Sequence, residues 1–232
     1  MLKSGRDYVI GADLSLRDAV DVDTDFGAVG GFHTLCTDVG EIPGHPLSRF
    51  QAGDPLPSSL WNLNHRAKGG NNAGMVYEPT MDVWVDIYLF SYSDRKIRHE
   101  TVDDYQGIAL KMIKRLPAHE EFSSLAEGSN ELTYIKDSQY VSIAGGHVDT
   151  LGRRMISNIG CEDCAGLVWQ WLSSMDPADP QYRLLAGGGR GCAAACGSRY
   201  RRAGDARWAA SAGLGARFVS EPLYPRTRSQ AQ

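Results

Sequence analysis

The chain has 232 residues, of which 42% are hydrophobic, and a formal net charge of -4 at pH 7. This length corresponds to one large domain or two small ones, and the hydrophobic content is sufficient for a packed core. The small negative charge argues against a nucleic-acid-binding protein, because phosphate recognition usually requires a concentrated basic surface.

The N-terminal part, residues 1–50, is predicted to be a β-rich segment of short strands and turns. Its first residues lack the apolar run of a signal peptide. The acidic run at 18–25 lacks the central glycine and the terminal glutamate of an EF-hand, so a solvated surface is favoured over a calcium loop. A proline-rich passage then predicts a joint with a second unit, residues 51–226.

The first half of this second unit contains clear local patterns. Residues 54–66 predict a turn followed by a short helix capped near Ser58. The aromatic and β-branched runs 75–77 and 83–92 predict a hairpin. Apolar residues then share one helical face, which predicts a helix over 102–114 with this set in the core: Val102, Tyr105, Ile108, Ala109, Met112 and Ile113.

A second helix is predicted to begin near Ala118, after Pro117 interrupts the first, and to end before Gly128. His119 and Glu120 lie in its first turn, where a solvated helix start is favoured over a catalytic role. Both helices are expected to be scaffold. No stretch approaches the roughly 18 consecutive apolar residues of a transmembrane helix.

Further strands are predicted to begin at Arg154 and to cover 167–172, 182–187 and 216–220. Trp169 and Trp171 lie in the second of these strands. Two large aromatics in an apolar strand indicate core residues more often than ligand contacts. The end of the chain, 227–232, is predicted to be a frayed tail.

The five cysteines are an odd number and do not indicate a secreted disulfide framework. Cys161 and Cys164 have the spacing of a zinc half-site or a redox pair. Structural zinc normally has four ligands, and the other close pair is Cys192 and Cys196. Buried free thiols are therefore favoured over zinc or redox chemistry, and we expect no metal and no cofactor.

The C-terminal part has an unusual composition. Between Arg183 and Ser220 there is no Lys, Glu, Gln, Met, Asn or His, while Ala and Gly dominate, Arg recurs, and Asp205 is the single acid. Neither a helical period nor a strand alternation extends beyond a few residues. This pattern predicts irregular backbone that is held by a few fixed positions.

The motifs along the chain occur in a recognisable order, which runs through 114–117, 149–160, 166–172, 187–188, 199–201 and 215–218. This order resembles the formylglycine-generating-enzyme-like branch of the C-type lectin fold. Within that branch, 196–199 and 215–222 are most similar to the variable proteins of diversity-generating retroelements. The resemblance covers about residues 55–224 and implies an α+β fold, with two helices packed on small antiparallel sheets and a long irregular C-terminal segment.

In proteins of this family, template adenines are miscopied, and the affected codons cannot become those for Lys, Glu, Gln, Met or Trp. The composition of the C-terminal part fits this restriction, since of these types only Trp208 occurs there. The resemblance implies a ligand-binding display protein of the receptor-binding type, diversified over about residues 187–217. It also implies a protein or glycan target, no enzymatic activity, no nucleic acid and no membrane insertion. A monomer or small homo-oligomer would be made in the cytoplasm and then displayed on a virion or cell surface.

Site residues follow from the resemblance position by position. The diversified, ligand-binding positions would be Gly189, Arg190, Gly191, Cys192, Ala194, Ala195, Tyr200, Arg202, Gly204, Asp205, Ala206, Ala209, Ala210, Ala212 and Gly213. The fixed scaffold would include Trp169, Trp171, Gly187, Gly188, Cys196, Arg199, Arg201, Trp208 and Arg217.

Two alternatives stay open. One is a copper-dependent oxidase of the formylglycine-generating type, which would use Cys192 and Cys196 as soft ligands. The cysteine spacing and the residues around them depart from that pattern, because three residues separate the two cysteines here and four in the enzymes. The other alternative is an unvarying structural domain of a virion or surface.

Overall fold

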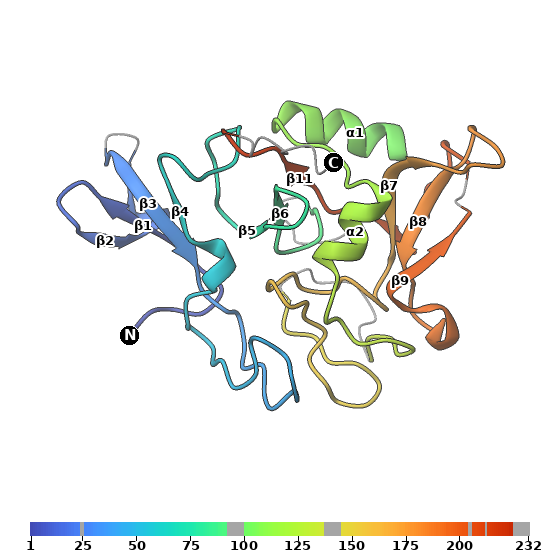
Figure 1. Cartoon of the computed structure of the whole chain (residues 1–232), viewed down its shortest axis with the longest axis horizontal. Coiled ribbons are helices and arrows are strands. Elements are labelled where there is room, and N and C mark those ends of the chain that lie inside the picture. Colours follow the sequence, from blue (N-terminus) through green and yellow to red (C-terminus); the bar gives the residue numbers. More distant parts are fainter. Residues whose placement is uncertain (24–25, 92–99, 137–144, 204–205, 212, 225–232) are drawn as a thin grey trace, which may run out of the picture.

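The computed structural model describes residues 1–23, 26–91, 100–136, 145–203, 206–211 and 213–224. Within these residues the chain forms three small sheets and two α-helices, so the predicted α+β class is confirmed. In Figure 1 the N-terminal sheet lies at one end of the molecule and the sheet that carries the C-terminal segment lies at the other. In the described part of the chain, no helix is both long enough and apolar enough to cross a bilayer.

The N-terminal sheet has the order β2-β1-β3-β4 and is antiparallel. Its strands are β1 (Asp7–Gly11), β2 (Leu16–Asp18), β3 (Ala28–His33) and β4 (Trp61–Asn62). Gly31 of β3 pairs with Trp61, and a Cβ at Gly31 would lie 2.3 Å from the Tyr8 carbonyl oxygen. The first sheet therefore includes a strand from beyond residue 50, while the position of the domain boundary stays a prediction.

Two local predictions in this part need correction. Within the acidic run, Asp21 and Asp23 are exposed as expected, but Asp18 is buried, and its carboxylate accepts a hydrogen bond from Val20 N at the start of a 3-10 turn, η1 (Ala19–Asp21). Residues 24–25 lie outside the described residues. The expected helix near Ser58 is a 3-10 turn, η2 (Pro57–Ser59), with no side-chain cap. Ser59 Oγ instead donates to the Leu56 carbonyl at 2.7 Å.

The predicted hairpin is confirmed as β5 (Met75–Glu78) and β6 (Val83–Asp86), which pair antiparallel. The second strand ends at Asp86, and residues 92–99 lie outside the described residues. A third strand, β11 (Val219–Ser220), adds to β6, so the last strand of the chain lies in the middle of the molecule.

Both predicted helices are confirmed, as α1 (Val102–Lys111) and α2 (His119–Leu125). Thr101 and Asp104 form a capping box at the start of α1. Met112 and Ile113, predicted in the core, are 43% and 56% exposed because α1 ends at Lys111 and Ile113 has a left-handed φ of 56°. The helical period of the sequence therefore continues past the helix itself.

The third sheet has the order β10-β7-β8-β9. Its strands are β7 (Trp169–Met175), β8 (Arg183–Gly187), β9 (Gly197–Arg202) and β10 (Leu214–Gly215), and a 3-10 turn, η3 (Ala193–Ala195), precedes β9. Strand β9 corrects the prediction of irregular backbone, because pairing with β8 orders a stretch that lacks any strand period. The predicted strand at Arg154 is replaced by isolated bridges, and the predicted strand 216–220 contributes only its last two residues, as β11.

The core unites all parts of the chain. Leu35 and Leu47 from the N-terminal segment belong to the same buried cluster as Phe122 of α2 and Leu172 of β7. Trp171 is fully buried, and Cys161 and Cys164 are buried free thiols, as predicted.

Candidate ligand-binding surface

The predicted site, 187–217, starts at the end of β8, forms η3 and the edge strand β9, and returns through β10 to the interior. In Figure 1 it is the orange-to-red part of the chain that follows β8 and includes β9. Its two ends are buried and most of its middle is exposed. The geometry of these ends explains how exposed side chains can be held in place.

The first end is a glycine pair with no room for side chains. Gly187 and Gly188 have φ of 85° and 80°, in the left-handed region that favours glycine. A Cβ at Gly187 would lie 2.3 Å from the Cys164 carbonyl oxygen, and one at Gly188 would lie 2.1 Å from that of Ala195. These contacts support their predicted place in the scaffold.

Arg217 forms the second end and is fully buried. Its guanidinium donates to the carbonyls of Asp86 and Ile87, each at 2.5 Å, and to that of Glu162. Because buried carbonyls need donors, one arginine satisfies backbone groups from two separate segments. The predicted scaffold role of Arg217 matches this position.

Glu131 holds the start of β9, a role that the sequence did not indicate. Its Oε1 accepts hydrogen bonds from Ser198 N at 2.8 Å and from Ser198 Oγ at 2.5 Å. Gly197 has a φ of 150°, and a Cβ there would lie 1.5 Å from Glu131 Oε2. The carboxylate of Glu131 therefore occupies the space beside Gly197 and bonds the start of the strand, although Glu131 and Ser198 are 67 positions apart in the sequence.

Arg201 attaches the middle of β9 to α2. It donates to His119 Nδ1 at 3.0 Å, to Ser123 Oγ at 2.7 Å and to several backbone carbonyls, and its guanidinium lies 4.8 Å from the centre of the Phe122 ring. Burial lowers the pKa of Arg201 to about 10. At the start of α2, Glu120 is exposed as expected for a solvated helix start, whereas His119 is half-buried and accepts this bond.

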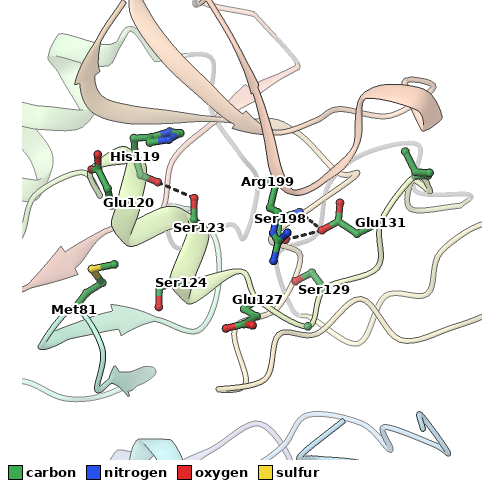
Figure 2. Close-up of a pocket in the computed structure, with 12 residues that line it drawn as sticks. Met81, His119, Glu120, Ser123, Ser124, Glu127, Ser129, Glu131, Ser198 and Arg199 are labelled. Atoms are coloured by element: carbon green, nitrogen blue, oxygen red, sulfur yellow. Dashed lines mark hydrogen bonds between the residues drawn. The ribbon is translucent and has the colours of Figure 1, made fainter. Parts of the chain in front are cut away.

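A cavity of about 880 Å³ lies beside this attachment, between α2, the loop after it and the start of β9. Figure 2 shows Glu120, Glu127 and Glu131 around it, with Ser198 and Arg199 contributed by β9. Among the residues that the structure describes, no predicted diversified position lines it. The cavity therefore borders the predicted surface without being formed by it.

Trp169 lies under the centre of the surface. It is 8% exposed, its ring centroid is 5.8 Å from that of Tyr200, and the Arg202 guanidinium carbon lies 4.9 Å from its ring centre. Gly189 is buried, and a Cβ there would lie 3.1 Å from Trp169 Cδ1. The structure thus brings two predicted ligand-binding residues onto one indole and places Gly189 below the surface.

The other predicted residues divide by exposure. The exposed ones are Arg190, Gly191, Ala194, Ala210 and Gly213, together with Tyr200 and Arg202. The half-buried ones are Cys192, Ala195, Ala206 and Ala209, while Gly204, Asp205 and Ala212 lie outside the described residues. Among the predicted scaffold, Arg199 and Trp208 are exposed, Trp208 to 70%. Which positions vary stays a prediction.

One of the two cysteines in the segment serves as a structural hydrogen-bond donor. Cys196 Sγ donates to the carbonyls of Gly189 at 3.3 Å and Cys192 at 3.0 Å, which uses the thiol as a structural donor. Burial raises the pKa of Cys196 to about 11. Without a bound metal ion, this environment favours the neutral thiol of Cys196.

Comparisons with known proteins agree with this architecture. No protein-family model and no curated protein matches the sequence. Among solved structures, the Major Tropism Determinant M1 Variant is similar with a TM-score of 0.77 at 19% identity, over 97% of this chain and 74% of that one. The P3c and U1 variants have TM-scores of 0.76 and 0.75, each at 19% identity over 96% of this chain and 74% of theirs. The predicted C-type lectin-like fold is therefore confirmed.

Proposed function

We propose that this chain is a ligand-binding display protein whose segment 187–217 is diversified by retroelement mutagenesis to bind varied macromolecular targets. The targets are proteins or glycans. The protein acts at a virion or cell surface after cytoplasmic synthesis, as a monomer or small homo-oligomer. It carries out no reaction of its own.

One observation supports this proposal above the others: an exposed edge strand with small flanking residues lies between rigid, buried ends. Substitution of exposed side chains usually changes stability by less than about 0.5 kcal/mol, so such a surface can vary while the fold persists. Tyr200 and Arg202 occupy its centre, and these residue types are enriched among the residues that dominate binding energy. The shared fold with proteins named as variants of a tropism determinant supports the same function.

Each alternative makes a different prediction. An oxidase would require Cys192 and Cys196 to bind copper as thiolates. Copper binding that is lost in Cys192→Ser and Cys196→Ser would favour it. An unvarying structural domain would show neither copper binding nor a target whose binding depends on Tyr200 and Arg202.

The deciding experiment is deep sequencing of the coding region for residues 184–222 in the source population. We expect substitutions to concentrate at the exposed positions between 190 and 213, while 196–199 and 215–222 stay constant. Gly189 should vary least among the predicted diversified positions, because Trp169 occupies the space beside it. A uniform segment would contradict the proposal and make copper titration the next experiment.

A further inference from the structure

Trp208 lines a hollow that the sequence did not indicate. The hollow has a volume of about 580 Å³ and lies where the start of α1, the turn between β7 and β8, and residues 207–208 meet. Its lining consists of Thr101, Asp103, Pro180, Gln181, Arg207 and Trp208. In Figure 1 the turn between β7 and β8 projects from the end of the third sheet. We call this site the Trp208 hollow.

The indole of Trp208 is unusually accessible for so large an apolar group, since it is 70% exposed. Tryptophan has one of the largest apolar surfaces of any residue type, and this surface is normally buried in the core or in an interface. Trp171, in the same sheet, is fully buried. An exposed indole that lines a hollow therefore indicates a surface for a ligand more than a part of the scaffold.

The polar groups of the hollow leave hydrogen-bonding capacity beside the indole. Arg207 donates from Nη2 and Nε to Asp103 Oδ1, at 2.8 Å and 3.3 Å. This ion pair ties the segment that bears Trp208 to the start of α1. Within the described part of the chain, the second carboxylate oxygen of Asp103 is not used by Arg207, and the side chain of Gln181 makes no hydrogen bond.

This combination selects the chemistry of the ligand. Of the six lining residues, only Pro180 and Trp208 are apolar, so a ligand in the hollow meets polar groups beside the indole. The paired charges of Asp103 and Arg207 give the hollow no strong preference for an anion or a cation. A pyranose ring has an apolar face of C–H groups and an edge of hydroxyls that both donate and accept, which matches one indole beside a carboxylate and an amide.

We propose that the Trp208 hollow binds a pyranose ring of a neutral glycan, with the ring stacked on Trp208 and its hydroxyls bonded to Asp103 and Gln181. This inference rests on the proposed function, because it names a glycan as a ligand of the surface that adjoins the diversified positions. It changes the role of Trp208 from scaffold to ligand contact. The tryptophan codon contains no adenine, so this contact stays constant while its neighbours vary.

The test uses the full chain and a panel of neutral sugars: glucose, galactose, mannose, fucose, N-acetylglucosamine and N-acetylgalactosamine. Saturation-transfer NMR reports which sugar protons contact the protein. We expect at least one sugar to receive transfer mainly on one face of its ring. A dissociation constant on the order of millimolar is expected for a ligand of this size on an open site.

The variants separate this site from its surroundings. Trp208→Ala should weaken sugar binding at least about 10-fold, Trp208→Phe should retain part of it because a ring remains, and Gln181→Ala should weaken it several-fold. Tyr224→Ala is the matched control, since Tyr224 is another aromatic with 67% exposure, and it should leave binding unchanged. Because Trp208 is exposed, its replacement should leave the melting temperature unaltered, which confirms that the variant is folded.

Failure of the inference can be told apart from failure of the proposed function. The inference is overturned if no sugar in the panel receives transfer, or if Trp208→Ala leaves the transfer unchanged. It is also overturned if the double variant Tyr200→Ala, Arg202→Ala removes sugar binding and Trp208→Ala does not. Sugar binding at Trp208 in a chain whose population shows no sequence diversity would leave the glycan site standing and reject diversification.

Discussion

Arg201 shows how one side chain can organise an exposed strand. Its five hydrogen bonds reach α2 and the backbone of β9 itself, so the strand is attached to the helix that packs against this sheet. The neighbouring residues Tyr200 and Arg202 point to the opposite face, onto Trp169. Alternation along β9 thus separates a structural side chain from two candidate binding side chains.

Replacing Arg201 with alanine should lower the free energy of unfolding by about 2–3 kcal/mol, because buried acceptors on α2 and β9 lose a charged donor. Urea denaturation of the purified protein measures this change. Arg190→Ala is the matched control, since Arg190 is exposed, and it should change stability by less than about 0.5 kcal/mol. Equal effects of the two substitutions would show that Arg201 does not hold the strand.

The contact between Trp169 and Tyr200 makes a second prediction at this scale. A double-mutant cycle of Trp169→Leu and Tyr200→Ala should give a coupling energy of about 0.5–1.5 kcal/mol, as expected for an aromatic pair beyond its buried area. Denaturation of the two single variants and the double variant supplies the measurement. A cycle of Trp169→Leu with Arg190→Ala should give no coupling. Additivity in the first cycle would mean that Tyr200 is not oriented by Trp169.

At the scale of elements, the turn that leaves β8 decides where the candidate surface begins. Gly187 and Gly188 adopt left-handed φ values and pass close to the backbones of Cys164 and Ala195. Gly166 N donates to both of their carbonyls at 3.1 Å. The turn is thus determined by close backbone packing, and η3 and β9 follow from it.

Gly188→Ala should therefore be strongly destabilising, by more than about 2 kcal/mol, because it combines a left-handed φ with a Cβ 2.1 Å from a carbonyl oxygen. Gly191→Ala provides a close control. Gly191 has a similar φ of 76°, but a Cβ there meets nothing within 4 Å. Gly191→Ala should lower the free energy of unfolding by only about 1 kcal/mol. Thermal unfolding of both variants separates the effect of backbone strain from that of steric overlap. Equal shifts in melting temperature would show that overlap at Gly188 adds nothing to the strain.

For the whole molecule, the shared core indicates that the N-terminal segment and the lectin-like part unfold together. Leu47 lies in the cluster that contains Phe122 and Leu172. Replacing Leu47 with alanine should lower the free energy of unfolding by about 2–5 kcal/mol, the range for truncation of a large buried aliphatic side chain. Tryptophan fluorescence reports several parts of the chain. Unfolding followed by this fluorescence and unfolding followed by hydrogen exchange of β7 should have the same midpoint. Loss of the N-terminal sheet alone, with β7 still protected, would show two independent units.

Several features followed from the sequence alone because they depend on neighbours along the chain. The apolar stripe of α1, the aromatic hairpin of β5 and β6, and the apolar run of β7 each encode their element locally. The order of the short motifs indicated the C-type lectin-like fold, which the comparisons confirm. The candidate surface was also found this way, because the composition of the C-terminal part is visible without any structure.

Other features were decided by the tertiary structure. Strand β9 has no period of its own; β8, Glu131 and Arg201 order it. The bonds that these two side chains form between β9 and other parts of the chain join residues 67 to 82 positions apart. The burial of Gly189 and the exposure of Trp208 likewise depend on what packs against them. Contacts over such separations leave no pattern in a single sequence. The sequence by itself therefore determined the fold class and the residues of the candidate surface, whereas the folded chain decided which described side chains of that segment are exposed.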